Sequence, residues 1–199
     1  MSRIGIFGGT FNPVHNGHIN LLNKVCESIS LDKIYVFPTF IPPHKIAVDL
    51  ASGEDRLAMC RLAFEDNLIV QISDFELKQE GKSYTINTLI HLKSIYPDDE
   101  LFLIMGSDML LTIEEWKSYK EIFKLCTIVG ATRNTEDSKR IISYSNVIKN
   151  MGGKVIIIPV NPYVISSTDI RSMIAQGLDY TCYLPQKVVK YIRYRKLYQ

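Results

Sequence analysis

The sequence predicts an α/β fold with a doubly wound, mostly parallel sheet and helices on both faces. Short apolar runs alternate along the chain with longer stretches of helical periodicity, which is the pattern of successive βαβ units. The runs are apolar at consecutive positions, as expected for parallel strands that are buried on both faces. Glycine-rich or hydroxyl-rich segments follow several runs, at the strand ends where such Rossmann-like sheets bind ligands.

The expected strands are short apolar runs with turn-forming residues on both sides. They cover Ile4–Phe7, Ile34–Phe37, Leu68–Ile72, Leu101–Met105, Cys126–Ala131 and Val155–Val160. Helical spacing predicts helices near Asn16–Ser28, Gly53–Glu65, Tyr84–Ile95, Ile113–Lys124, Ser138–Met151 and Thr168–Gln176. Neither an internal repeat nor a linker divides this pattern, so we expect a single domain over residues 1–199.

The composition is that of an ordinary globular protein, with 46% hydrophobic and 22% charged residues. A net charge of +2 does not favour a nucleic-acid partner, and the basic segment Lys187–Lys196 predicts an amphipathic terminal helix with Tyr191, Ile192 and Leu197 turned inward. No apolar stretch approaches the roughly 18 residues of a transmembrane helix, and no signal-like segment precedes Ile4. We therefore expect a cytoplasmic protein without a membrane partner.

The cysteines do not indicate a metal site. Cys26, Cys60, Cys126 and Cys182 stand far apart, without a C-x-x-C pair. Their neighbours are apolar, so we expect reduced core residues rather than zinc ligands.

The most informative segment is Arg3–His18, in which a buried strand runs into a glycine turn and a helix. Gly8 and Gly9 permit positive φ and a close approach of the backbone to a ligand. His15 and His18 stand where the helical pattern begins. The first N–H groups of a helix attract anions, and imidazoles add further donors. The segment therefore predicts a phosphate-binding site.

Two other loops carry phosphate-binding residue types. The proline-rich loop Pro38–Lys45 presents His44 and Lys45 as adjacent donors. Residues Ser166–Asp169 are strong N-cap residues that predict a helix start, and Arg171 follows as a permanent cation. Taken alone, the first loop is also compatible with a solvated crossover and the second with simple capping. Their occurrence with the glycine turn favours phosphate binding.

These motifs resemble those of the nucleotidyltransferase α/β phosphodiesterase superfamily. Its first signature is similar to Gly-Gly-Thr-Phe at 8–11 followed by His-x-Gly-His at 15–18, and its second to Ile-Ser-Ser-Thr-x-Ile-Arg at 165–171. Members transfer a nucleotidyl group from a nucleoside triphosphate to a phosphate or similar acceptor. The chain lacks the G-x-G-x-x-G fingerprint, and a Walker A loop ending at Ser83 would need glycine where Glu76 stands.

Within the superfamily, nearly the whole chain resembles the bacterial nicotinate-nucleotide adenylyltransferase family. The resemblance rests on Pro-Pro-His-Lys at 42–45, Asp-Arg at 55–56, Ser-Tyr-Thr at 83–85, Gly-Ser-Asp at 106–108 and the later Trp116. Two positions depart from the family pattern. Asn12 stands where the family usually has aspartate, and Thr-Arg-Asn at 132–134 replaces an Arg-Pro-Gly turn, retaining Arg133 as a cation.

The resemblance implies transfer of AMP from ATP to nicotinate mononucleotide, with Mg²⁺ bound through the ATP phosphates. Such catalysis depends on positioning and charge stabilisation, with His18 at the α-phosphate and His15 orienting ATP. Lys45 and Arg171 are the other implied catalytic residues, as cations that neutralise the triphosphate and the leaving group. The other implied ATP contacts are Gly8, Gly9, Thr10, Phe11, Gly106, Asp108, Ser166, Ser167 and Thr168.

The implied acceptor contacts are His44, Tyr84, Thr85, Trp116 and Arg133. No unassigned Arg or Lys stands at an obvious acceptor position in Ser83–Thr85 or Asp108–Trp116. We therefore expect the N–H groups of the helix that begins near Tyr84 to hold the nicotinate carboxylate.

Two other functions remain open at this stage. One is a different adenylyl- or cytidylyltransferase of the same superfamily, and the other is a nucleotide-binding regulator without activity. An aminoacyl-tRNA synthetase core shares the His-x-Gly-His pattern, but 199 residues are too few for one. The sequence leaves the oligomeric state open and is compatible with a homo-oligomer.

Overall fold

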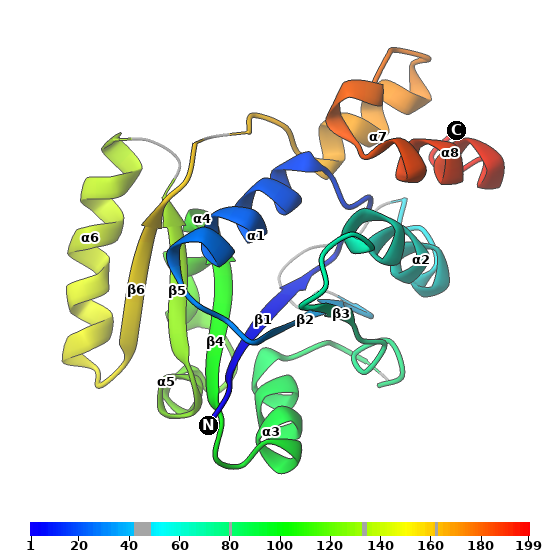
Figure 1. Ribbon diagram of the computed structural model, residues 1–199. Coiled ribbons are helices and arrows are strands. Elements are labelled where there is room, and N and C mark those ends of the chain that lie inside the picture. Colours follow the sequence, from blue (N-terminus) through cyan, green and yellow to red (C-terminus); the bar gives the residue numbers. More distant parts are fainter. Residues whose placement is uncertain (42–48, 80, 133–134, 162) are drawn as a thin grey trace. The chain divides into compact units, whose positions relative to one another are not determined.

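The computed structural model describes residues 1–41, 49–79, 81–132, 135–161 and 163–199, with the backbone alone for 135–138 (Figure 1). The strands are β1 (Arg3–Gly9), β2 (Lys33–Pro38), β3 (Val70–Ile72), β4 (Glu100–Gly106), β5 (Thr127–Thr132) and β6 (Lys154–Pro159). They form a six-stranded parallel sheet in the order β3-β2-β1-β4-β5-β6. Because the order runs outward from β1 in both directions, the predicted doubly wound α/β fold is confirmed.

The longer helices lie in stretches in which the sequence showed helical spacing. The α-helices are α1 (Asn16–Ser28), α2 (Gly53–Phe64), α3 (Thr85–Ile95), α4 (Ser107–Leu110), α5 (Tyr119–Leu125), α6 (Thr135–Asn150), α7 (Ser167–Ala175) and α8 (Gln186–Arg195). Two 3₁₀ turns, η1 (Ile113–Glu115) and η2 (Thr181–Tyr183), complete the described elements.

Two expected elements differ from the structure. The predicted helix Ile113–Lys124 is wrong as one element, because Ser118 takes a left-handed φ of 57° between η1 and α5. The predicted strand at Leu68 begins only at Val70, and the Leu68 side chain is 96% exposed. In both places the pattern of apolar residues continues across a turn. The turn contains no glycine or proline that would mark it in the sequence. The short helix α4 has no counterpart among the helices predicted from the sequence.

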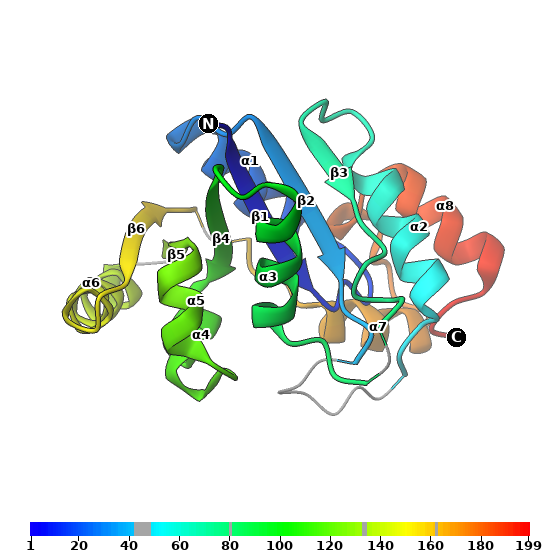
Figure 2. The ribbon, with the colours of Figure 1, turned by 90° about the horizontal axis from the view of Figure 1, so that it is seen from below.

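The chain divides into two compact units. Unit 1 contains residues 1–8, 21–35 and 84–162, and unit 2 contains residues 9–20, 36–83 and 163–199. Within unit 1, Figure 2 shows α3, α4 and α5 on one side of the strands and the part of α1 that belongs to this unit, residues 21–28, on the other side. Consecutive residues of β4 are buried, in register with β1 through pairs such as Ile4 and Leu101. The continuous apolar runs therefore reflect burial on both faces.

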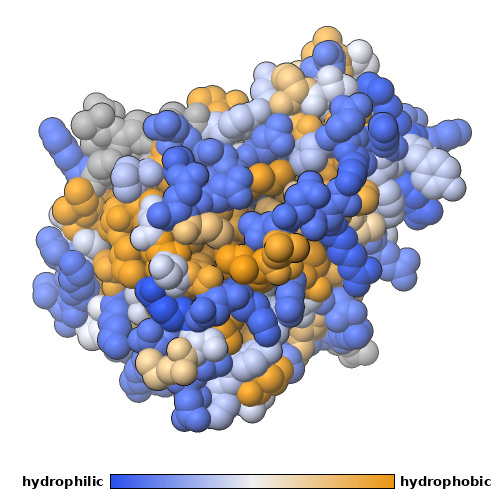
Figure 3. Space-filling view, viewed as in Figure 1, coloured by the Kyte–Doolittle hydropathy of each residue, from blue (hydrophilic) through white to orange (hydrophobic). Residues whose placement is uncertain are grey.

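The edge strand β6 is less buried than the strands inside the sheet. Its residues 155–157 are only partly buried, and α6 beside it carries exposed Ile142 and Met151. Apolar side chains accordingly reach the surface of unit 1 in this region (Figure 3). Among the described residues, no helix is long and apolar enough to cross a membrane.

The expectation of buried, reduced cysteines is only partly confirmed. All four thiols are free, and Cys60 and Cys126 are buried. Cys26 is half-buried and Cys182 is exposed, so the prediction that they are core residues is wrong for these two. Burial raises the pKa of the Cys126 thiol to about 12, which keeps it protonated and unreactive near neutral pH.

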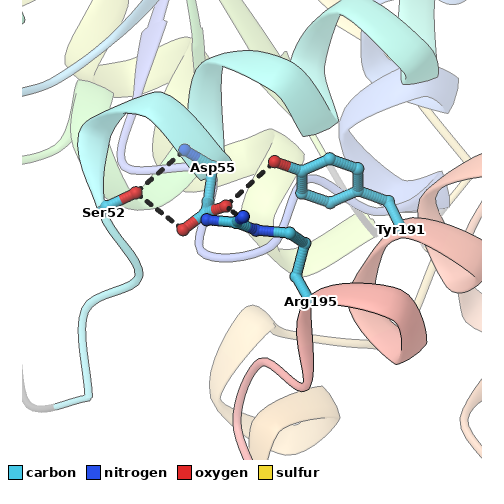
Figure 4. Close-up of polar contacts among 4 residues, drawn as sticks. All are labelled: Ser52, Asp55, Tyr191 and Arg195. Atoms are coloured by element: carbon cyan, nitrogen blue, oxygen red, sulfur yellow. Dashed lines mark hydrogen bonds and ion pairs between the residues drawn. The ribbon is translucent and has the colours of Figure 1, made fainter.

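In unit 2, a buried carboxylate joins α2 to α8. Asp55 accepts hydrogen bonds from the Tyr191 hydroxyl at 2.9 Å and from Arg195 Nε at 3.0 Å (Figure 4). The Ser52 hydroxyl caps α2 and donates to the same carboxylate at 2.6 Å. Burial of Asp55 opposes its ionisation, but these donors outweigh burial and lower its pKa.

We expect Asp55→Asn to lower the free energy of unfolding by about 2 kcal/mol at pH 7, the scale of hydrogen bonds to a charged group. The carboxyl pKa is lower in the folded than in the unfolded state. Its stabilisation is therefore complete above the unfolded-state value of about 3.9 and is lost as the pH falls through the folded-state value. Urea denaturation at pH 7 and pH 3 measures this change.

The same titrations on Asp98→Asn provide the control, because Asp98 is exposed. The difference between the Asp55 variant and the wild type should be smaller at pH 3 than at pH 7, whereas the control should follow the wild type at both pH values. A stability difference for Asp55→Asn that is unchanged between the two pH values would contradict the proposed role of its charge.

Candidate active site

The turn between β1 and α1 is tightly packed around an aromatic ring. Phe11 is 1% exposed and has a left-handed φ of 49°. Its ring lies against Gly9, where an added Cβ would approach Phe11 Cζ to 2.9 Å. Gly9 is therefore needed for close packing, and Phe11 shapes the turn from the interior rather than through an exposed ring.

The two histidines that open α1 have a defined hydrogen-bonding state. The His15 N–H donates to Nδ1 of His18 at 3.2 Å, and the Gly17 N–H donates to Nδ1 of His15 at 3.1 Å. A neutral imidazole whose Nδ1 accepts a hydrogen bond carries its proton on Nε2. Both rings are therefore held as Nε2–H donors by the backbone, with ring centroids 3.8 Å apart. The sequence placed these residues together correctly.

A buried arginine holds the same turn from inside unit 2. Arg56 is 1% exposed, and its Nη1 donates to the carbonyl of Thr10 at 2.9 Å and of Thr39 at 2.6 Å. Its Nε donates to the carbonyl of Ala51 at 3.1 Å. The guanidinium thus joins three loop segments and places a positive charge beneath the turn. No role for Arg56 could be predicted, because its only local signature is an Asp-Arg pair at a helix start.

Helix α7 is capped and then attached to the turn. Ser166 and Asp169 form a capping box, in which the Ser166 hydroxyl accepts from the Asp169 N–H at 3.1 Å. The Ser167 hydroxyl donates to the carbonyl of Pro13 at 2.9 Å, and Arg171 Nη1 donates to the carbonyl of Asn12 at 2.9 Å. A guanidinium has five N–H donors, so this bond orients Arg171 without exhausting it. Thr168 is exposed in the first turn.

Asn12, the departure from the family's aspartate, is a buried structural residue in this chain. It is 4% exposed, and its side chain bonds the carbonyl of Asp49, the N–H of Ala51 and the hydroxyl of Tyr198. The amide donates to one carbonyl while accepting from two donors. A carboxylate would lack the donor that Asp49 receives. From the sequence, Asn12 was only a departure from the usual aspartate, and this internal role was not predicted.

Unit 1 brings together two of the predicted acceptor segments. Tyr84 is the N-cap residue of α3 without a side-chain cap bond, so the predicted helix entrance at Thr85 is confirmed. The Lys117 ammonium lies 4.4 Å from the centroid of the Tyr84 ring, which places the segment containing half-buried Trp116 beside α3. Lys117 lies one residue beyond the segment Asp108–Trp116 in which an acceptor cation was sought, so this cation was not predicted.

The other predicted residues are placed less completely. Gly106 caps the short helix α4 at the carboxyl end of β4, and Asp108 is exposed in its first turn. Gly8 is exposed at the end of β1. The predicted contacts His44, Lys45 and Arg133 lie outside the described residues. Within the described ranges, no group of three or more His, Cys, Asp or Glu side chains could hold a metal ion.

Comparison with known proteins narrows the family of this chain. A family model described as cytidylyltransferase-like matches residues 6–173. The chain is 36% identical to a probable nicotinate-nucleotide adenylyltransferase of Shewanella woodyi, over 99% of both chains. It is 38% identical to a probable nicotinate-nucleotide adenylyltransferase of Geotalea daltonii, over 98% of both chains.

Among solved structures, the fold is similar to the Plasmodium falciparum nicotinic acid mononucleotide adenylyltransferase complexed with NaAD. The TM-score is 0.81 at 19% identity, over 100% of this chain and 98% of that chain. A putative nicotinate-nucleotide adenylyltransferase of Vibrio parahaemolyticus has a TM-score of 0.71 at 20% identity, over 100% of this chain and 96% of that chain. At these identities the two structures support the fold.

Proposed function

Because the chain belongs to the nicotinate-nucleotide adenylyltransferase family, we propose that it transfers AMP from ATP to nicotinate mononucleotide, giving deamido-NAD and pyrophosphate. The observation that supports this chemistry most directly is the turn after β1. There the backbone holds both His15 and His18 as Nε2–H donors. Arg171 is bonded to the carbonyl of Asn12 in the same turn. The turn thus combines neutral and cationic donors, as an ATP phosphate chain requires.

The reaction needs positioning more than proton transfer. An oxygen of the acceptor 5′-phosphate attacks the α-phosphorus of ATP, the new P–O bond forms, and pyrophosphate leaves with the electron pair of the broken bond. Because a phosphate monoester is largely ionised at neutral pH, the attacking oxygen requires no general base. His18 Nε2–H then stabilises the charge that develops at the α-phosphate, while His15 orients ATP.

The triphosphate contacts divide between backbone and side-chain donors. We assign the backbone of Gly8–Phe11 and the first turn of α7 to the phosphate oxygens, with Arg171 and Lys45 as cations. In the structure the single Ser167 hydroxyl proton is donated to Pro13, and Ser166 caps α7. We therefore assign to Ser166 and Ser167 a contribution through their backbone N–H groups. The neighbouring Thr168 would contribute its side chain.

Adenylyl transfer from ATP generally uses a divalent metal ion. We propose Mg²⁺, bound to the ATP phosphates together with water, because this ion favours phosphate oxygens and retains its waters. The described residues of the turn are hydroxyl, amide, imidazole and guanidinium groups, which suit phosphate rather than a bare cation. The metal supplies charge neutralisation at the leaving pyrophosphate.

The direct test is a pyrophosphate-release assay with purified protein, ATP and MgCl₂. We expect release with nicotinate mononucleotide and the appearance of deamido-NAD by chromatography, and loss of both when CTP replaces ATP. Chelation with EDTA should stop the reaction and added Mg²⁺ should restore it. Binding of ATP without pyrophosphate release for any mononucleotide acceptor would instead indicate a regulator, and preference for CTP another transferase.

We expect Arg171→Ala to lower kcat/KM for ATP roughly 10- to 100-fold, the scale of hydrogen bonds to a charged group. Arg171→Lys should recover only part of this loss, because an ammonium lacks the planar fork of a guanidinium. Steady-state kinetics with varied ATP measure both variants. Arg140, exposed on α6, provides the matched control variant. If both Arg171 variants keep the wild-type kcat/KM for ATP, Arg171 does not contact the triphosphate and is only a surface residue of α7.

A further inference from the structure

The end of the chain forms a hook after α8. Lys196 has a left-handed φ of 51°, and its N–H and that of Leu197 bond back to carbonyls in the last turn of α8. Tyr198 also has a left-handed φ, of 65°. Non-glycine residues in this region carry a conformational cost. Two of them within three positions therefore indicate that other contacts hold the hook in place. Leu197, expected to turn inward, is only half-buried.

The helix before the hook is firmly attached to unit 2. Val188, Val189 and Ile192 are buried on one side of α8. Tyr191 and Arg195 donate to the buried Asp55 carboxylate at the start of α2 (Figure 4). The hook therefore begins from a fixed point, and the position of Tyr198 is determined by packing rather than by an unattached terminus.

The Tyr198 hydroxyl reaches the turn that follows β1. It donates to Oδ1 of Asn12 at 2.8 Å. The same Asn12 side chain contacts the segment before α2 through Asp49 and Ala51, and the Asn12 carbonyl accepts from Arg171 at 2.9 Å. One buried amide thus links the chain end, the segment before α2, the turn and the guanidinium.

We propose that Tyr198 is a positioning residue for ATP, whose hydroxyl fixes Asn12 so that the Asn12 carbonyl orients Arg171 toward the triphosphate. This inference rests on the proposed function and on the assignment of Arg171 to the ATP phosphates. Phenylalanine would fill the same space, but only the hydroxyl supplies the second donor to Oδ1. Burial raises the pKa of Tyr198, so the phenol keeps its proton throughout the neutral range.

Tyr198→Phe tests the proposal because it deletes one hydroxyl and keeps the ring. We expect KM for ATP to rise about three- to tenfold, the scale of one hydrogen bond, while kcat and KM for nicotinate mononucleotide stay within about twofold. The dissociation constant of ATP, measured by titration calorimetry, should rise by the same factor. This second readout does not require turnover, so it separates failure of the hook from failure of the proposed reaction.

Two tyrosines of α8 provide matched controls. Tyr194→Phe alters an 84% exposed side chain on the same helix and should change neither Tm nor KM. Tyr191→Phe removes the hydroxyl that donates to Asp55, so it should lower Tm without changing KM for ATP. If Tyr198→Phe behaves like Tyr191→Phe, its hydroxyl contributes stability alone and the proposal is wrong.

The dependence on Arg171 is tested by combining the variants. If Tyr198 acts through Arg171, adding Tyr198→Phe to Arg171→Ala should weaken ATP binding by less than about 1.5-fold further, since coupled residues are not additive. A further three- to tenfold loss in that background would show that the two residues act independently and would overturn the proposed route.

Discussion

Replacing His18 by alanine is expected to lower kcat about 10²- to 10³-fold, the scale for loss of one preorganised transition-state donor. The structure adds a reason for this size. The backbone N–H of His15 occupies Nδ1 of His18 at 3.2 Å, so the Nε2–H donor is oriented before substrate arrives. The Phe11 ring lies edge-on to the imidazole with centroids 5.0 Å apart and limits its rotation. A donor held in this way does not need to reorient when charge develops in the transition state.

The measurement is single-turnover chemistry at saturating ATP and nicotinate mononucleotide, with the ATP dissociation constant determined in parallel. ATP binding should change much less than kcat, because several backbone donors of the turn remain. His91, half-buried on α3, supplies the matched histidine-to-alanine control. If His18→Ala reduces kcat no more than His91→Ala does, His18 has no part in the chemical step.

The local geometry of the turn after β1 could be predicted from sequence because its determinants lie close together in the chain. Gly9, His15 and His18 lie within ten positions, and their placement follows from a strand end, a glycine turn and a helix start. The predicted start of α7 is confirmed for the same reason, since Ser166 and Asp169 are three residues apart and cap the helix together. Contacts between residues a few positions apart can be recognised from a single sequence.

The supporting contacts of the turn could not be predicted, because they connect distant positions. Arg56 donates to Thr10, 46 positions away, and Tyr198 donates to Asn12, 186 positions away. A single sequence gives no indication that an arginine will be buried against carbonyl oxygens rather than exposed on α2. Likewise, nothing local marks Ser118 as left-handed, so the split between η1 and α5 appears only in the structure.

The wild-type protein is expected to prefer nicotinate over nicotinamide mononucleotide by about 10³-fold or more in kcat/KM, since sites built around hydrogen bonds discriminate strongly. The two acceptors differ by a carboxylate against a carboxamide of nearly the same shape. Helix α3 begins at Thr85, and its N-cap residue Tyr84 makes no side-chain cap bond. We assign the first N–H groups of α3 and the Thr85 hydroxyl to the carboxylate. A carboxamide would turn its NH₂ toward some of these donors and leave buried groups unpaired.

Three substitutions separate the sources of this preference. Trp116→Ala should raise KM for both mononucleotides alike, because stacking on the cationic pyridinium does not distinguish acid from amide. Thr85→Val should reduce the preference about tenfold, since one hydrogen bond to a charged group is lost. Lys117→Gln tests the cation whose ammonium lies 4.4 Å from the Tyr84 ring centroid.

If Lys117→Gln keeps the full preference for nicotinate mononucleotide, the start of α3 determines selectivity, as proposed. If the variant loses this preference, the Lys117 ammonium determines it. The physical distinction is one of range. Helix N–H groups act through short, directed hydrogen bonds, so their effect depends on the turn at Thr85 and little on ionic strength. An exposed ammonium acts through a screened charge, so its contribution should fall as salt is raised. Equal kcat/KM for acid and amide in the wild type would exclude both sources.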